Sequence, residues 1–303
     1  MRFKLGTWNC FGMARKALDA ITGIRAPAPR RLQHDHVLSS CASADVFCVQ
    51  ELFSRDAEDF FDKICKKLAP DRTFAFIRDH NRLHFRTGTV RGTGLGICSL
   101  GALQETRYHH FSRSTGWDRL ARKGVLHARI GLSSHVEIDL VTVHLQAGED
   151  PGAARVRQAQ LGELSQFLQG VTSRERACIV CGDFNICGLR TERAGPEYAR
   201  LRDTLPDFLD LGATDDHATF DPTPHVNSLA FAFEPQGRRQ RLDYIFLRPP
   251  ASAAYSIACN GVSLFLHEPL TALQLSSRSE AFASDHFGLV ATFECSSRAS
   301  TAS

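Results

Sequence analysis

Six short polar segments, each following or interrupting an apolar run, contain the residues of this chain best suited to chemistry. They read Thr7-Trp8-Asn9, Gln50-Glu51, His144-Leu145-Gln146, Gly182-Asp183-Phe184-Asn185, Leu242-Asp243-Tyr244 and Ser284-Asp285-His286. Magnesium-like cations take oxygen ligands and keep several waters, so one or two carboxylates with nearby amides suffice to hold one. A sheet that delivers these side chains to one end would therefore build a site for a hard cation and a phosphate.

Asp183 and Asn185 follow the apolar run Ala177–Val180, which has the composition of a buried strand. Because side chains two residues apart on a strand share a face, the two are expected to point into one site. Asp183 could bind a metal or act as a general acid. Asn185 could contact a metal or donate to a phosphoryl oxygen without adding negative charge. Taken alone, the segment is equally consistent with a turn that ends a strand.

Ser284-Asp285-His286 places a carboxylate next to an imidazole just before a strand-like run. A base that takes a proton from water needs a pKa near neutrality, which His supplies, and a fixed tautomer, which a carboxylate partner supplies. Adjacent residues rarely pair side chain to side chain on one strand face, so the partner of His286 could be Asp243, with Asp285 in another role. An unrelated surface Asp-His pair is the competing interpretation.

Three other polar residues close apolar runs. Glu51 follows Val46–Gln50 and could hold a cation or cap the next helix. Asn9 could likewise contact a cation or act as a cap or turn residue, through its side-chain amide. His144 follows Leu140–Val143 and could be a site residue or a core histidine.

The elements that must position these residues are strands mixed with helices from end to end. Strands are expected at Phe3–Asn9, Val46–Gln50, Thr73–Ile77, Gly94–Ser99, Leu103–His110, Gly124–Leu132, His135–Val143, Ala177–Asp183, Arg241–Leu247, Tyr255–Leu266 and Gly288–Phe293. Helices fit Arg30–Cys41, Arg55–Leu68, Ala154–Leu168 and Pro196–Leu205. Since no linker divides the chain, we predict a single α+β domain over residues 1–295, with two sheets face to face and helices outside, followed by a flexible tail over 296–303.

Composition supports a soluble globular protein. Of 303 residues, 43% are hydrophobic and 23% charged, and the net charge of +3 is too small to indicate nucleic acid by itself. No apolar run reaches the 18 residues of a membrane span. The start of the chain shows no standard export signal, which leaves open a cytoplasmic location or export by a non-standard or trimmed signal. The ten cysteines are expected to be small buried hydrophobes in a reducing compartment.

A basic stretch between Arg107 and Arg129 carries six Arg or Lys residues, with Tyr108, Phe111 and Trp117 among them. Basic and aromatic residues together could contact nucleic acid. The alternative is a solvated loop with no partner.

As an ordered set, the polar segments resemble the endonuclease/exonuclease/phosphatase superfamily. The residues that match in order and approximate spacing are Asn9, Glu51, His144, Asp183, Asn185, Asp243, Asp285 and His286. That superfamily includes apurinic endonucleases, deoxyribonuclease I, inositol polyphosphate 5-phosphatases and neutral sphingomyelinases. The resemblance extends from Phe3 to Phe293 and implies a DNase I-like fold, a four-layered α/β sandwich of two mixed sheets with outer helices.

The connecting motifs are most similar to bacterial sphingomyelinases. They are Lys123-Gly124, the segment Thr142–Ala147, Asn227-Ser228-Leu229-Ala230 and Leu242-Asp243-Tyr244-Ile245. The Pro-Ala-Trp-Cys-Asp-Arg element of 5-phosphatases and the Gly-rich loop of apurinic endonucleases are absent. Where some bacterial members carry an aromatic hairpin that enters membranes, the segment Tyr255–Leu270 offers Phe265 and Leu266 but no Trp.

The resemblance implies a role for each site residue. The implied metal ligands are Asn9, Glu51, Asp183, Asn185 and His286, around one or two Mg²⁺ ions for which Mn²⁺ or Co²⁺ could substitute. His286 would deprotonate the attacking water, oriented by Asp243 or Asp285. Asp183 would bind a second ion or protonate the leaving group, and Asn185 and His144 would donate to non-bridging oxygens.

The implied activity is a metal-dependent phosphodiesterase. Its expected substrate is sphingomyelin at a membrane surface, cleaved to ceramide and phosphocholine by a monomeric protein. The alternative is a metal-dependent nuclease acting on DNA or RNA. A non-catalytic binding protein is disfavoured because each polar position, Glu51 and His286 included, is filled.

Overall fold

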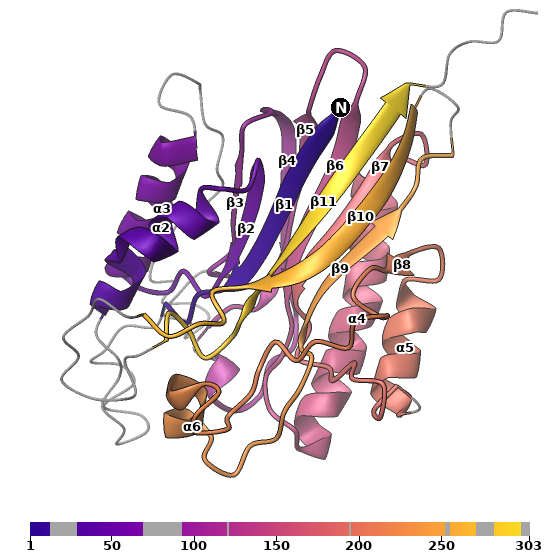
Figure 1. Cartoon of the computed structure of the whole chain (residues 1–303). Helices are drawn as coiled ribbons and strands as arrows, with labels where there is room; N and C mark the ends of the chain where they lie inside the picture. The colour runs from indigo at the N-terminus through magenta and orange to yellow at the C-terminus, as the bar shows by residue number, and fades with distance from the viewer. Residues whose placement is uncertain are drawn as a thin grey trace, which may run out of the picture.

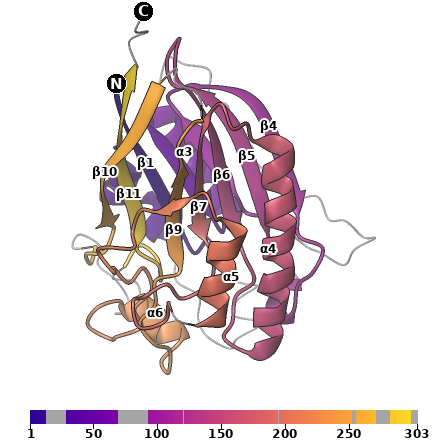
Figure 2. The same cartoon turned by 90° about the vertical axis from the view of Figure 1, so that its right-hand side faces the viewer.

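The computed structural model describes residues 1–12, 29–68, 93–119, 121–193, 195–251, 255–270 and 282–297. Two sheets pack face to face, with helices on their outer sides (Figures 1 and 2). The predicted four-layered sandwich is therefore confirmed. Within the described ranges, no helix combines the length and apolar character needed to cross a bilayer.

The sheets are mixed, as expected. The five-stranded sheet has the order β10-β11-β1-β2-β3, formed by Tyr255–Phe265, Gly288–Ser297, Arg2–Asn9, Val46–Gln50 and Gly96–Ser99. The six-stranded sheet has the order β4-β5-β6-β7-β9-β8, formed by Ala102–His110, Gly124–Gly131, Glu137–His144, Ala177–Asp183, Asp243–Arg248 and Leu209–Asp210. The pairs β1–β2 and β6–β7 are parallel. Carboxyl ends of parallel partners lie at the same edge, which gathers the polar segments at one end of the sandwich.

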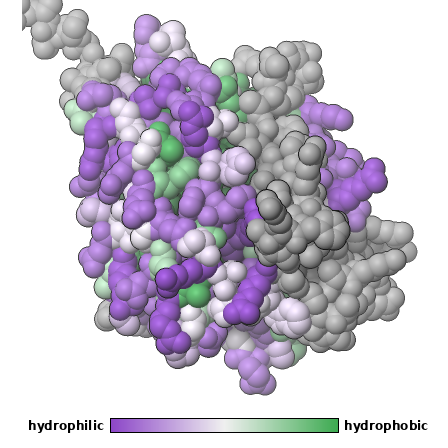
Figure 3. All heavy atoms as spheres, turned by 180° about the vertical axis from the view of Figure 1, so that it is seen from behind, coloured by the Kyte–Doolittle hydropathy of each residue, from purple (hydrophilic) through white to green (hydrophobic). Residues whose placement is uncertain are grey.

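Three apolar layers follow from the period of two along each strand. Leu5, Ile138 and Phe293 belong to the core between the sheets. Trp8, on the opposite face of β1, packs against Phe60 of α3 (Arg55–Leu68), beside α2 (Asp35–Cys41). The outer face of the six-stranded sheet packs on α4 (Pro151–Val171) and α5 (Pro196–Thr204). Seen from behind, the described part of the surface is mostly hydrophilic, with apolar residues in small separate groups (Figure 3).

The longest helix begins where its sequence predicts a helix start. The Asp150 side chain accepts hydrogen bonds from the amides of Gly152 and Ala153, and Pro151 occupies the first helical position. An acidic N-cap followed by Pro satisfies the free amides and sets the backbone for a helix.

Most of the expected elements are found, with shifts of a few residues at their ends. The helix expected over Arg30–Cys41 is instead the short helix η1 (Pro29–Gln33) and then α2, because His34 adopts extended backbone and caps α2 with its side chain. The short elements η2 (Gly116–Arg119), β8 and α6 (Ser228–Phe233) were not expected. The strand expected at Thr73–Ile77 lies outside the described residues. All ten cysteines are free, and eight are buried.

The structure corrects one expectation about membrane contact. Phe265 and Leu266 are not an exposed pair at the end of β10. The Phe265 ring lies 6.0 Å from that of Phe47 and 6.5 Å from that of Trp8, and Leu266 is buried in the same core. The absence of a Cβ at Gly288 makes room for the Phe265 ring. Both residues therefore stabilise the fold and cannot serve as a membrane anchor in this conformation.

Replacing Phe265 with Ser should lower the free energy of unfolding by about 2 kcal/mol or more, because it removes a partly buried aromatic ring from a packed cluster. Urea denaturation would measure the change. Leu209→Ser, at an exposed position, is the control and should have little effect. Equal stabilities for the Phe265 variant and the wild type would contradict this packing.

A buried charged cluster far from the polar segments gives the fold a pH dependence. The Asp139 carboxylate contacts Nε2 of His127 at 3.0 Å and accepts hydrogen bonds from Arg176 and the amide of Ser173. Burial alone would raise the pKa of Asp139, but the hydrogen bonds from His127, Ser173 and Arg176 outweigh it and hold the pKa below its ordinary value. A depressed carboxyl pKa adds stability above the unfolded-state pKa of about 4, and this stability is lost as pH falls through the folded-state pKa.

Asp139→Asn should therefore destabilise the protein by about 2 kcal/mol at pH 7, since hydrogen bonds to a buried charge are worth about 1.5–3 kcal/mol. The difference from wild type should begin to shrink below about pH 4, where the carboxyl group of the unfolded state takes up a proton, and should reach its minimum below the lower folded-state pKa. Urea denaturation at a series of pH values would test this. A destabilisation that stays constant down to the acid limit would rule out a contribution from the carboxylate charge.

Candidate active site

The polar segments meet because of strand register. In the six-stranded sheet, His144 of β6 pairs with Asp183 of β7, and Asp183 pairs with Asp243 of β9. In the other sheet, Asn9 of β1 pairs with Gln50 of β2, directly before Glu51. The two rows are in contact across the sheets: the side-chain amide of Asn9 donates to Asp183 Oδ2 at 3.0 Å.

Glu51 forms the part of the site suited to a cation. Its Oε1 accepts a hydrogen bond from Asn9 Nδ2 at 3.2 Å, while its Oε2 is buried and has no hydrogen-bond partner among the described residues. The backbone of Glu51 has φ of 65°, in the left-handed region that is costly for a non-glycine residue. A partly exposed carboxylate on strained backbone, with one buried and unsatisfied oxygen, forms with Asn9 and Asp183 a donor set that fits a hard divalent cation.

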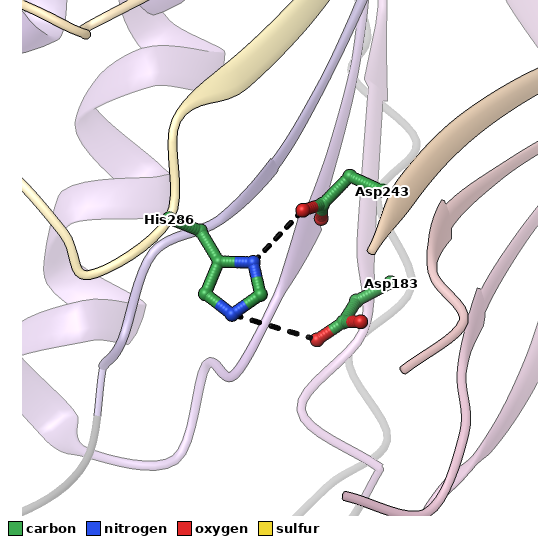
Figure 4. Close-up of side chains that lie close together, drawn as sticks. All are labelled: Asp183, Asp243 and His286. Atoms are coloured by element: carbon green, nitrogen blue, oxygen red, sulfur yellow. Dashed lines mark hydrogen bonds and ion pairs between the residues drawn. The ribbon is translucent and has the colours of Figure 1, made fainter. Parts of the chain in front are cut away.

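His286 and Asp243 form the predicted pair. The Nδ1 atom of His286 lies 2.8 Å from Asp243 Oδ2, and its Nε2 atom lies 4.0 Å from Asp183 Oδ2, so the ring lies between two carboxylates (Figure 4). Burial alone would lower the pKa of His286, but the Asp243 and Asp183 charges raise it well above its ordinary value. Burial raises the pKa of Asp243, against the opposing charge of His286.

One ligand atom from each of Asp183, Asp243 and His286 lies within 4.8 Å of the other two, so the three residues could themselves surround an ion. We interpret this group differently. The 2.8 Å contact uses Nδ1 of His286 and one oxygen of Asp243 in a hydrogen bond. The arrangement therefore resembles a base with its orienting carboxylate more than a set of metal ligands.

Asp183 and His144 lie close together at the centre of the site. His144 Nε2 lies 3.3 Å from Asp183 Oδ2 and 3.8 Å from Glu51 Oε1. Burial alone would raise the pKa of Asp183, but the positive charges of His286, His144 and Lys123 hold it below its ordinary value. Asp183 is therefore a carboxylate in this arrangement, which favours a ligand over a proton donor.

The Asp285 carboxylate contacts the hydroxyl of Ser284. The hydroxyl of Ser284 donates to the carbonyl of Asn9 at 2.7 Å, accepts from the His286 amide, and lies 3.1 Å from Asp285 Oδ1. Burial raises the pKa of Asp285 to about 7, against the opposing charge of His286. The sequence left two candidates for the partner of His286, and the geometry favours Asp243.

Asn185 lies in a turn and not on the strand face assumed from the sequence. β7 ends at Asp183, and Asn185 has φ of 51°. Its amide nitrogen donates to the carbonyl of Leu145 at 3.0 Å, and its backbone amide donates to Asp183 Oδ1 at 2.9 Å. Its side chain thus connects the ends of β6 and β7. The position of Asn185 therefore follows from this hydrogen bond and not from the shared strand face that was expected.

Lys123 is the principal site residue that the sequence did not identify as such. Its side chain is buried, with Nζ in contact with Nε2 of His144 and 3.5 Å from Asp118 Oδ1. The motif Lys123-Gly124 was noted only as the entry to a strand. A charged residue directly before a buried strand was the available signal.

Three further residues position the site without touching its centre. Thr219 Oγ1 accepts the backbone amide of Asp243 at 3.1 Å. Asn227 caps α6, and its side-chain amide donates to the carbonyls of Ser284 and Asp285. These hydrogen bonds hold α6 against the Ser284-Asp285 segment and give Asn227 a structural role. Arg31 donates to the carbonyls of Ala283, Cys10 and Phe11 and so ties the turn after Asn9 to the segment that carries His286.

The curated relatives of this chain include bacterial lipid-hydrolysing enzymes by name. Sphingomyelinase C from Bacillus cereus is 27% identical over 217 residues, which cover 66% of this chain and 63% of that protein. Phospholipase C from Staphylococcus aureus is 24% identical over 212 residues, 67% of this chain and 62% of that protein. The chain thus matches a little under two thirds of the length of these relatives.

Solved structures share the fold. Beta toxin from Staphylococcus aureus superimposes with a TM-score of 0.73 at 19% identity, covering 95% of this chain and 99% of that one. A variant of the same toxin, with the same TM-score, was solved with bound magnesium ions. TDP2 from D. rerio, complexed with a single-strand DNA product, has a TM-score of 0.67 at 19% identity, covering 97% of this chain and 99% of that one.

The family model described as Endonuclease/Exonuclease/phosphatase family matches residues 6–286, which include every residue of the site from Asn9 to His286. The resemblance noted in the sequence is confirmed, both for the superfamily and for its sphingomyelinase relatives. On this match over most of its length, the chain belongs to the endonuclease/exonuclease/phosphatase family.

Proposed function

We propose that this protein is a phosphoric diester hydrolase that uses a divalent cation, and that it converts sphingomyelin to ceramide and phosphocholine. The observation that carries the proposal is that one site contains both a candidate cation ligand and a candidate general base. Glu51 offers a carboxylate oxygen with no hydrogen-bond partner among the described residues, and His286 has its Nδ1 atom held by Asp243.

The cation site would be centred on Glu51, with Asn9 helping directly or through water. Mg²⁺ is the expected ion, in one or two copies, because carboxylate and amide oxygens are the ligands it prefers. Bound there, the ion would act as a Lewis acid that offsets negative charge on the phosphoryl oxygens.

The proton chemistry would fall to His286. Because Nδ1 carries the hydrogen bond to Asp243, Nε2 is the atom that would accept a proton from the attacking water. A cation bound beside Asp183 would offset the carboxylate charge that raises the pKa of His286 and so free Nε2 for this role. The Asp243 charge fixes this tautomer and stabilises the imidazolium that forms. Of the five ligands implied by the resemblance, His286 thus fits the role of base better than that of ligand.

Positive charge for the phosphate would come from the opposite wall of the site. His144 and the buried Lys123 are in contact there, and the Asn185 amide lies at the edge. Asp183, held as a carboxylate by these charges, would bind a second ion or hold the first in place. Protonation of the leaving group by Asp183 would require its pKa to rise on substrate binding.

Sphingomyelin is proposed as substrate because of the relatives named sphingomyelinase C and phospholipase C and the shared connecting motifs. A nuclease is the alternative. It is favoured by the basic stretch Arg107–Arg129 and by the fold shared with a TDP2 solved with DNA. Both substrates contain a phosphodiester, so the site chemistry described above would serve either.

One assay separates the two substrates. Purified protein with Mg²⁺, offered sphingomyelin vesicles and plasmid DNA in parallel, should release phosphocholine and leave the plasmid intact. EDTA should abolish the release and added Mg²⁺ should restore it, because the proposed chemistry depends on the cation and the Ser284 hydroxyl is held by its hydrogen bond to the Asn9 carbonyl. Plasmid cleavage without phosphocholine would refute the substrate proposal alone, and full activity in EDTA would refute the cation proposal.

Glu51→Ala and His286→Ala should each lower kcat by roughly two orders of magnitude or more, the usual size of a lost general base or metal contact. Raising the Mg²⁺ concentration should partly restore the Glu51 variant, whose loss acts through ion affinity, and should not restore the His286 variant. Circular dichroism would verify that both variants are folded. An equal response of the two variants to Mg²⁺ would show that this division of roles is wrong.

A further inference from the structure

The strand β4 forms one edge of the six-stranded sheet, and its inner neighbour is β5 (Figure 2). Phe111, directly after β4, donates its backbone amide to the carbonyl of Lys123. Because such hydrogen bonds recur at every second residue of an antiparallel pair, the odd-numbered residues of β4 beyond its bulge direct their backbone groups toward β5. Thr106 and Tyr108 therefore direct theirs outward, where no other strand of the described residues pairs with them.

This outer edge is open to solvent. The Arg107 side chain is 61% exposed and Tyr108 is 56% exposed. The carbonyl of Thr106 accepts a hydrogen bond from the neighbouring Arg107 side chain at 3.2 Å. An open edge is a template for another strand, and charged side chains along it prevent unselective pairing. Pairing remains favourable only with a strand whose charges are complementary.

The charges on this edge follow a defined order. Glu105 and Arg107 lie on one face of β4 and form an ion pair at 3.1 Å, and Glu105 also contacts Arg129 of β5 at 2.6 Å. A strand that adds to this edge must place a basic side chain opposite Glu105 and an acidic one opposite Arg107. Read in the antiparallel direction, β4 of a second copy carries its own Arg107 and Glu105 in that order.

Charge also selects one register for the pairing of two copies. With the twofold axis at Thr106, the two Thr106 residues exchange backbone hydrogen bonds, and Glu105 of each copy lies opposite Arg107 of the other. A shift by one hydrogen-bonding step in either direction would put Glu105 opposite Glu105, or Arg107 opposite Arg107. Like charges directly opposite destabilise a strand pair. The edge is therefore self-complementary in a single arrangement.

We propose that β4 pairs with β4 of a second copy of this chain, antiparallel and centred on Thr106, to form a symmetric dimer. The dimer replaces the monomer expected from the resemblance. The bulge between Leu103 and Glu105 confines regular pairing to a few residues. The dimer is accordingly weak, with a dissociation constant on the order of 100 µM, in keeping with a small interface.

Both active sites remain open in this dimer. His110, at the end of β4, pairs with Gly124 of β5, which pairs with His144 of β6. The site thus lies toward the carboxyl end of β4, and antiparallel pairing points the two carboxyl ends in opposite directions. The inference does not depend on the proposed function, because association is measured without substrate.

Sedimentation equilibrium of the whole chain, over a range of concentrations around about 100 µM, tests the association. We expect the apparent mass to rise from one chain toward two, and the dimer fraction to fall with added NaCl because the ion pairs are exposed. Glu105→Arg and Arg107→Glu each place like charges at both positions, so each variant alone should associate at least tenfold more weakly. An equimolar mixture of the two variants restores both opposite pairs and should form a heterodimer of near wild-type affinity.

A backbone substitution provides an independent check. Thr106→Pro removes the outward amide and leaves the hydrogen bonds to β5 intact, so it should abolish the dimer, whereas Thr106→Val keeps the amide and the dimer. Circular dichroism would verify folding, and the Thr106 pair decides if a charge variant does not fold. A wild-type chain that stays monomeric, a variant mixture that does not associate, or a dimer unaffected by Thr106→Pro would overturn the proposal.

Discussion

The site depends on the strand register of β6, β7 and β9, which places His144, Asp183 and Asp243 in one row across the sheet. A slip of one residue would turn each of these side chains to the opposite face, toward the apolar layer under α4 and α5. Register is fixed here because both faces of β7 are buried, as are all seven of its residues. The same burial that fixes the fold therefore fixes the spacing between His144, Asp183 and Asp243.

Burying so many charges is costly unless they are paired. Asp183, Asp243 and Asp285 share a small volume with His144, His286 and Lys123, and the shifted pKa values record the balance between burial and mutual attraction. The backbone adds strain at Glu51 and Asn185, which adopt left-handed conformations at the ends of their strands. These features make the site less stable than an apolar core would be. The three apolar layers around it offset that cost and hold the strained residues in place.

Strand positions were well predicted from the sequence because continuous apolar runs are a local signal. The polar segments were found for the same reason, as they stand where those runs end. The period of two along a strand argued against Asp285 and for Asp243 as the partner of His286, and the 2.8 Å contact between His286 Nδ1 and Asp243 Oδ2 agrees with that inference. The roles of Lys123, Thr219 and Arg31 were not predicted from the sequence. They depend on tertiary contacts with partners that lie 21, 24 and more than 250 positions away along the chain, respectively. The break between η1 and α2 was not predicted either, because it depends on the backbone conformation of a single residue, His34.

Site chemistry and substrate choice are separable in this fold. In the proposed mechanism, Glu51, His286 and Asp243 act on the phosphodiester, which is the group that a lipid and a nucleic acid share. Discrimination between the two must therefore come from the surface around the site, where loops carry specificity on a rigid scaffold.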